Sequence, residues 1–116
     1  MTTPLEDMAA KVRSFLDDAR AKAKDGLSVA EFGELLVAML HLVTDELDAV
    51  QHLTGPEKKG IALEAVAALF DSVADKCVPM AAYPLWLASR PLVRSVVLAL
   101  ASGALESLLP LVRAQA

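Results

Sequence analysis

Aromatic residues and cysteine are scarce in this sequence, and each shortage excludes a class of protein. Phe, Trp and Tyr make up only 4% of the 116 residues, although 55% of the residues are hydrophobic. Because Ala and Leu supply much of the apolar content, the composition favours helices over a β-sheet rich in aromatic and β-branched residues. Cys77 is the only cysteine, so an intrachain disulfide and a multi-cysteine metal site are both excluded.

The chain also lacks an excess of positive charge. It carries 11 Lys and Arg residues against 15 Asp and Glu residues, a formal net charge of −4, and its basic residues are scattered. Nucleic-acid binding requires clustered Lys and Arg to neutralise phosphates, so nucleic acid is not an expected partner. Residues 1–10 show neither the basic start nor the apolar run of a secretory signal. Together with the single cysteine, this predicts a cytoplasmic protein.

Motifs that carry catalysis, cofactors or metals are missing from the sequence. It contains no glycine-rich phosphate loop, Ser/His/Asp order or nucleophile elbow. His41 and His52 are about 16 Å apart along a predicted helix, so they cannot share one metal ion. Residues 25–32 resemble the second half of an EF-hand loop, but Ala21 and Ala23 stand where two oxygen ligands are needed. We therefore expect no catalytic residue, no cofactor and no metal, and a protein that is not an enzyme.

Capping signals and apolar periodicity predict four helices, over residues 4–24, 29–52, 56–77 and 91–113. The first two starts have a Thr or Ser followed three residues later by Glu, which is the pattern of a capping box, with Thr3 and Ser28 as the caps. The third start has either Thr54 or Gly55 as its cap, with Pro56 in the first turn. Gly26 follows the first helix, where a left-handed residue ends a helix without strain. We predict a single all-α, four-helix bundle-like domain over residues 1–116.

A segment interrupted by prolines precedes the last predicted helix. Pro79 and Pro84 break the apolar periodicity, so an ordered connection is predicted there instead of one straight helix. The run that follows, residues 92–112, is apolar on most of its sides. We predict that this last helix is the most buried of the four, with Leu100 and Leu105 in the core.

The charged side chains are predicted to lie on polar helix faces in contact with water. The two acidic groups are Asp45, Glu46 and Asp48, and Glu64, Asp71 and Asp75. Acid–base catalysis would require two acids to converge in a cleft. Neither acidic group is expected to do so, because both lie on polar faces. Lys58 and Lys59 fall in the first turn of a predicted helix, where cations oppose the helix dipole. Pairing with acids such as Asp45 or Asp48 is the expected compensation, and contact with a partner is the alternative.

The chain has more apolar side chains than its own interior is expected to hold. Its mean hydropathy is +0.46, and apolar patches that stay on a surface usually mark contacts. The candidate interaction surface is Tyr83, Leu85, Trp86 and Leu87, because the prolines keep this stretch from burying one regular stripe, and Trp86 is expected at or beside a contact. We therefore expect a helical protein–protein interaction or self-association module whose partner is itself, as a homo-oligomer, or another protein.

Membrane association through the apolar region 83–112 is the alternative function. Tyr and Trp suit the headgroup region of a bilayer, and arginines near a helix end can extend toward it. A membrane span needs about 20 apolar residues. Arg90 and Arg94 interrupt one end of the region, and Glu106 and Pro110 interrupt the other, so a membrane surface is the less favoured partner.

The order of the capping and turn signals resembles that of a group of known proteins. The signals are residues 25–28 with Glu31, then residues 53–59, then a connection broken by prolines and an apolar last helix. In this order the chain resembles small uncharacterised all-helical proteins encoded by bacteria and their phages. The resemblance covers most of the chain from Asp25 onward. It implies a helical fold and a phage or prophage origin, and that group has no assigned activity or catalytic residues to transfer.

Overall fold

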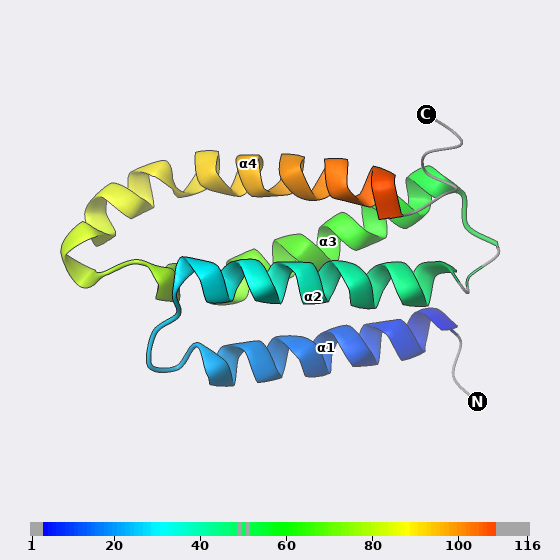
Figure 1. The fold of residues 1–116 in the computed structure, drawn as a ribbon, viewed down its shortest axis with the longest axis horizontal. Coiled ribbons are helices and arrows are strands. Elements are labelled where there is room, and N and C mark those ends of the chain that lie inside the picture. The colour runs from blue at the N-terminus through cyan, green and yellow to red at the C-terminus, as the bar shows by residue number, and fades with distance from the viewer. Residues whose placement is uncertain (1–3, 49, 51, 109–116) are drawn as a thin grey trace.

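The computed structural model describes residues 4–48, 50 and 52–108, which fold into four α-helices and contain no β-strand. Two short 3-10 turns join the last two α-helices. The elements are α1 (Pro4–Lys22), α2 (Val29–Asp48), α3 (Gly55–Val73), η1 (Ala74–Cys77), η2 (Met80–Ala82) and α4 (Tyr83–Leu108). The predicted all-α, four-helix bundle-like fold is confirmed (Figure 1).

The capping box predicted at Ser28 is present, and Thr54, one of the two caps considered for the third start, also forms one. The Ser28 hydroxyl accepts from the Glu31 backbone N–H at 3.0 Å, and the Glu31 carboxylate accepts from the Ser28 N–H at 3.0 Å. Thr54 and Glu57 make the same reciprocal pair, at 3.2 and 3.1 Å. Gly26 has φ of 109°, the left-handed conformation expected at the end of a helix. The predicted cap at residue 3 lies outside the described residues.

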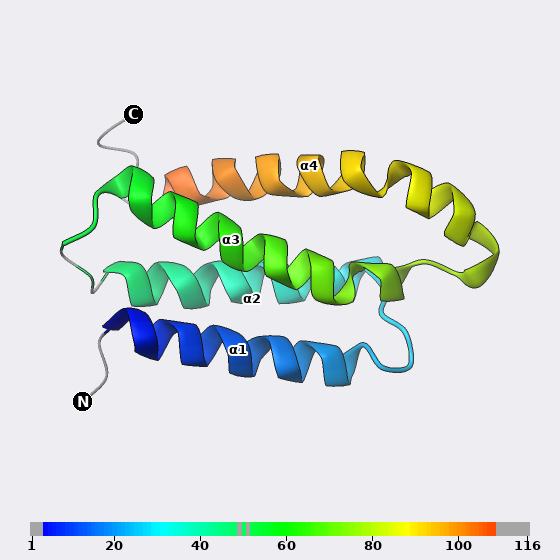
Figure 2. The same cartoon turned by 180° about the vertical axis from the view of Figure 1, so that it is seen from behind.

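The bundle places α1 and α4 on opposite sides of α2 and α3. Within the part of the chain that the structure describes, α2 and α3 pack on each other and on both outer helices, whereas α1 and α4 do not meet (Figures 1 and 2). The central core is aliphatic, and its fully buried side chains include Met39, Val43 and Leu47 of α2 and Val66 and Leu69 of α3. The inner helices α2 and α3 therefore supply the centre of the core.

The last helix starts earlier than predicted. Residues 83–90 were expected to belong to an ordered connection before the helix, but α4 begins at Tyr83. Pro84 occupies its first turn, where a missing backbone N–H leaves no helical hydrogen bond unmade. Pro91 lies inside α4, where it removes one backbone hydrogen bond and the helix continues past it. The predicted end, residues 109–113, lies outside the described residues.

The prediction that the last helix is the most buried is wrong. Leu100 is 68% exposed, and the buried side chains of α4 among the described residues are Ala101 and Leu105. α4 packs on α3 and α2 along one side only, and its first turns extend beyond the ends of these helices (Figure 1). The most completely buried large side chains lie mainly on α2 and α3, because those two helices have neighbours on several sides.

Candidate interaction surface

The solvent side of α4 carries a stripe of large apolar residues. Leu85, Leu92, Val96 and Leu100 are separated by seven, four and four residues, so they lie on one side of a helix with 3.6 residues per turn. Their side chains are 74%, 69%, 51% and 68% exposed. We call these four residues the outer face of α4. The sequence puts Ala88, Ala99 and Gly103 on the same side, so the face carries no charge.

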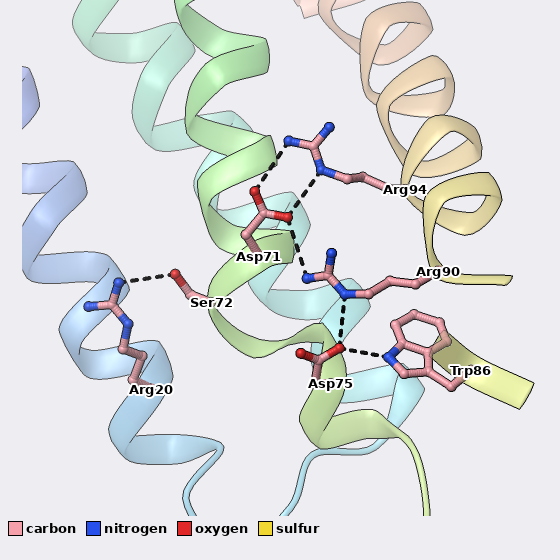
Figure 3. Close-up of polar contacts among 7 residues, drawn as sticks. All are labelled: Arg20, Asp71, Ser72, Asp75, Trp86, Arg90 and Arg94. Carbon is pink, nitrogen blue, oxygen red and sulfur yellow. Dashed lines mark hydrogen bonds and ion pairs between the residues drawn. The ribbon is translucent and has the colours of Figure 1, made fainter. Parts of the chain in front are cut away.

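The two arginines of α4 point the opposite way, toward α3 (Figure 3). Arg94 binds both carboxylate oxygens of Asp71, with Nε and Nη2 at 3.1 and 3.2 Å. Arg90 donates from Nε to Asp75 at 3.0 Å and from Nη2 to Asp71 at 3.4 Å. Asp75 also accepts from the indole N–H of Trp86 at 2.6 Å. These contacts attach α4 to α3 and leave the outer face without a charged group.

The polar network shifts the pKa values of its members. The hydrogen bond from Trp86, together with the charge and hydrogen bond of Arg90, lowers the pKa of Asp75 below its ordinary value of 3.8. The hydrogen bond to Asp75 raises the pKa of Arg90 in turn. These side chains are 25% to 48% exposed, so solvent screens the ion pairs and each contributes little to stability. Their main effect is to set the rotation of α4 about its own axis.

An aromatic cluster lies beside this network. The Trp86 ring is 6.1 Å from the Phe70 ring, which in turn meets Phe32 edge to face at 6.1 Å. The guanidinium carbon of Arg90 sits 5.1 Å from the centre of the Phe70 ring, within the range of a cation–π contact. Trp86 is therefore held on the inner side of α4 by both its ring and its N–H.

The structure separates the four residues that the sequence singled out for contact. Tyr83, Leu85 and Leu87 are exposed, whereas Trp86 is half-buried against α3. Leu85 belongs to the outer face of α4, and Leu87, two residues on, points in a different direction around the helix. The four predicted residues therefore do not form one continuous face. The exposed apolar surface that includes Leu85 continues along α4 through Leu92.

Sequence reasoning missed two features of this surface. Asp71 and Asp75 were expected to face water, yet they are ion-paired with Arg90 and Arg94. The matching four-residue spacing of the two acids and the two arginines was a usable signal. The second missed feature is the outer face beyond residue 87, because the helix was expected to be buried on most sides.

The remaining charged residues that the sequence highlighted have other positions. Lys59 forms an ion pair with Glu106 of α4 at 2.7 Å. The partners expected from the sequence were acids such as Asp45 or Asp48. Lys58 is only 1% exposed, so its stem is part of the packing at the start of α3. Glu64 is exposed, as expected.

Metal-ligating and nucleophilic side chains do not gather at any one place in the described part of the chain. No group of three or more His, Cys, Asp and Glu residues there is arranged to hold a metal ion. His41 and His52 are both exposed. Burial raises the pKa of the Cys77 thiol, which disfavours the reactive thiolate.

The segment Met80–Glu106 is long and apolar enough to cross a bilayer by length and composition. Only 6% of its most apolar stretch is buried inside the protein, which agrees with the exposed outer face of α4.

No family model, no curated protein and no solved structure matches this chain. The function is therefore argued from the geometry of α4.

Proposed function

We propose that this protein is a non-enzymatic helical module that associates with a second copy of itself through the outer face of α4. The observation that carries this proposal is the uncharged stripe of Leu85, Leu92, Val96 and Leu100, each at least half exposed. Contiguous apolar patches on soluble proteins usually mark binding sites. Removing a Leu or Val side chain fully from water contributes about 1.5 to 3 kcal/mol, so four such residues supply a substantial driving force.

The charge distribution of α4 supports a like surface as the partner. The chain has a net charge of −4, so two copies repel each other at long range. The four residues of the outer face add no charge to this repulsion, and the nearby Arg90 and Arg94 are turned inward and paired with Asp75 of η1 and Asp71 of α3. A strongly charged partner would find no complementary charge there, whereas a second uncharged stripe fits without desolvating an ion.

The sizes of the residues along the stripe suit an antiparallel, two-fold pairing of α4 with its copy. In a two-fold contact each residue pair occurs twice, once from each side. When residues 92 and 96 lie nearest the two-fold axis, each large side chain lies opposite either a small residue or another large side chain of the second copy. The pairs are Leu85 with Gly103, Ala88 with Leu100, and Leu92 with Val96. Gly103 is exposed, and an added Cβ there would meet nothing within 4 Å, which leaves room for Leu85 of the partner.

A pair of matched valine variants tests this function. Val96 on the outer face of α4 is 51% exposed, and Val37 on α2 is 53% exposed. We expect the wild-type protein to be a dimer by light scattering over a series of dilutions. Val96→Asp is expected to be monomeric, because dimerisation would bury two carboxylates, and Val37→Asp is expected to stay dimeric. A wild-type protein that is monomeric at every concentration, or equal dissociation of both variants, would contradict the proposal.

Membrane association is the second candidate, supported by the apolar segment Met80–Glu106. Tyr83 and Trp86 lie at one end of it, where aromatic side chains favour the membrane interface. Embedding α4 completely would also bring Arg90, Arg94 and their partners Asp71 and Asp75 toward the bilayer, at a high desolvation cost. Flotation with vesicles of neutral and anionic phospholipid separates the candidates. Binding that Val96→Asp abolishes, in a protein that is monomeric without lipid, would favour the membrane.

A further inference from the structure

An apolar pocket lies on the inner side of α4, where this helix meets the start of α2 and the end of α3. Its volume is about 230 Å³. No polar surface lines it, and its walls are Val29, Phe32, Phe70, Ala74, Cys77, Val78, Trp86, Val93 and Val97. None of the four residues of the outer face of α4 lines this pocket. The pocket is therefore distinct from the proposed contact surface.

Aromatic side chains are concentrated at this pocket. The chain contains three Phe, one Trp and one Tyr, and Phe32, Phe70 and Trp86 all line it. The rings contact one another in edge-to-face and tilted arrangements, whereas the fully buried centre of the bundle is largely aliphatic. Aromatic walls favour a further ring, because edge and face carry opposite partial charges.

The polar groups nearest the pocket already have partners. The Trp86 N–H donates to Asp75, and Arg90 is bonded to Asp75 and Asp71. None of the buried side-chain nitrogens and oxygens in the described residues lacks a hydrogen-bond partner. A charged or strongly polar ligand would lose its hydration in this pocket without gaining a partner, so the lining selects an uncharged molecule.

We propose that this pocket binds a small uncharged aromatic compound of one or two rings. An apolar cavity of about 150 Å³ stays dry and binds benzene, so a volume of 230 Å³ has room for one substituted ring or two fused rings. Residues of α2, α3, η1 and α4 line the site, and the Asp75–Trp86–Arg90 network holds the Trp86 wall in place. The site extends beyond the proposed function, since self-association does not use it.

The test uses the full chain with toluene and naphthalene as probes and benzoate as the charged counterpart of toluene. Trp86 is the only tryptophan, so its indole N–H resonance reports directly on the pocket. Saturable shifts of that resonance are expected with toluene and naphthalene, and binding of benzoate at least about tenfold weaker. Both neutral probes should also raise the melting temperature. No saturable shift up to the solubility limits of both neutral probes, or equal binding of benzoate, would overturn the proposal.

Two phenylalanine variants on neighbouring positions of α4 locate the binding. Val97→Phe fills the pocket and should weaken toluene binding at least about tenfold. Val96→Phe adds the same ring to the outer face and should leave toluene binding unchanged. Equal affinity in both variants, with each folded by circular dichroism, would contradict the site. Val96→Asp separates this proposal from the proposed function, because it should dissociate the dimer and keep toluene binding.

Protection of Cys77 gives a second measurement in the unmodified protein. Cys77 lines the pocket and is partly buried, so toluene should slow its reaction with a thiol reagent. This result does not depend on whether Val97→Phe folds. A rate of Cys77 modification that saturating toluene leaves unchanged would place any bound toluene elsewhere and would overturn the assignment of this pocket.

Discussion

The indole N–H of Trp86 donates a hydrogen bond of 2.6 Å to Asp75, which joins the first turn of α4 to η1, the turn that follows α3. This bond turns inward a residue that the sequence placed at a contact. It also leaves Leu85, the preceding residue, on the solvent side with 74% of its surface exposed. One hydrogen bond thus helps to decide which side chains of α4 face outward.

Trp86→Phe is expected to lower the free energy of unfolding by about 0.5 to 1.5 kcal/mol. A smaller aromatic ring is kept in place of the indole, and the hydrogen bond to Asp75 is lost. The measurement is urea denaturation followed by circular dichroism. In a double-mutant cycle, Trp86→Phe added to Asp75→Ala, which removes the acceptor, should cost less than it does in the wild-type protein. Strictly additive losses would show that the two residues are not coupled.

Acid should destabilise the protein partly through its capping glutamates. The hydrogen bonds from Ser28 and Thr54 lower the pKa values of Glu31 and Glu57 from 4.5. A lowered folded-state pKa contributes stability above the unfolded value that is lost as the pH falls through the folded value. Glu57→Gln should therefore lose stability at pH 7 and show a smaller further loss below pH 4.5 than the wild-type protein. Parallel pH profiles of melting temperature would contradict this.

Ser28→Ala is expected to lower stability by about 0.5 to 2 kcal/mol, because the Ser28 hydroxyl caps the Glu31 amide at the start of α2. Thermal melts of the variant and of Ser14→Ala, an exposed serine inside α1, give the comparison. The Ser14 variant should melt like the wild-type protein or slightly higher, since Ala favours helix. Equal melting of Ser28→Ala and the wild-type protein would show that this cap contributes nothing.

Leu105→Ala should cost about 2 to 5 kcal/mol, because Leu105 is completely buried against the core. Leu100 was predicted from the sequence to lie in the core as well. Leu100 is 68% exposed, so in the monomer its replacement should change stability by no more than about 0.5 kcal/mol. Denaturation at a protein concentration where the chain is monomeric compares the two. Equal losses at both positions would contradict the observed rotation of α4.

Helix starts could be predicted from the sequence because capping is a local interaction. Ser28 with Glu31 and Thr54 with Glu57 act over three residues, so no distant part of the chain is needed to recognise them. The start of α4 was harder to place, because Pro84 and Pro91 are ambiguous signals. A proline is compatible with the first turn of a helix and can also kink or end one.

The sequence by itself determined the helical fold class, two of the capping boxes and the left-handed glycine that ends α1. Only the tertiary structure decided which side of α4 is buried. Residues 92–108 are apolar on most sides, so periodicity does not select a core face, and the orientation depends on distant partners. Asp71 and Asp75 hold Arg94, Arg90 and Trp86 toward α3. Because these contacts span 11 to 23 residues of chain, the fold must form before α4 has an inner and an outer face.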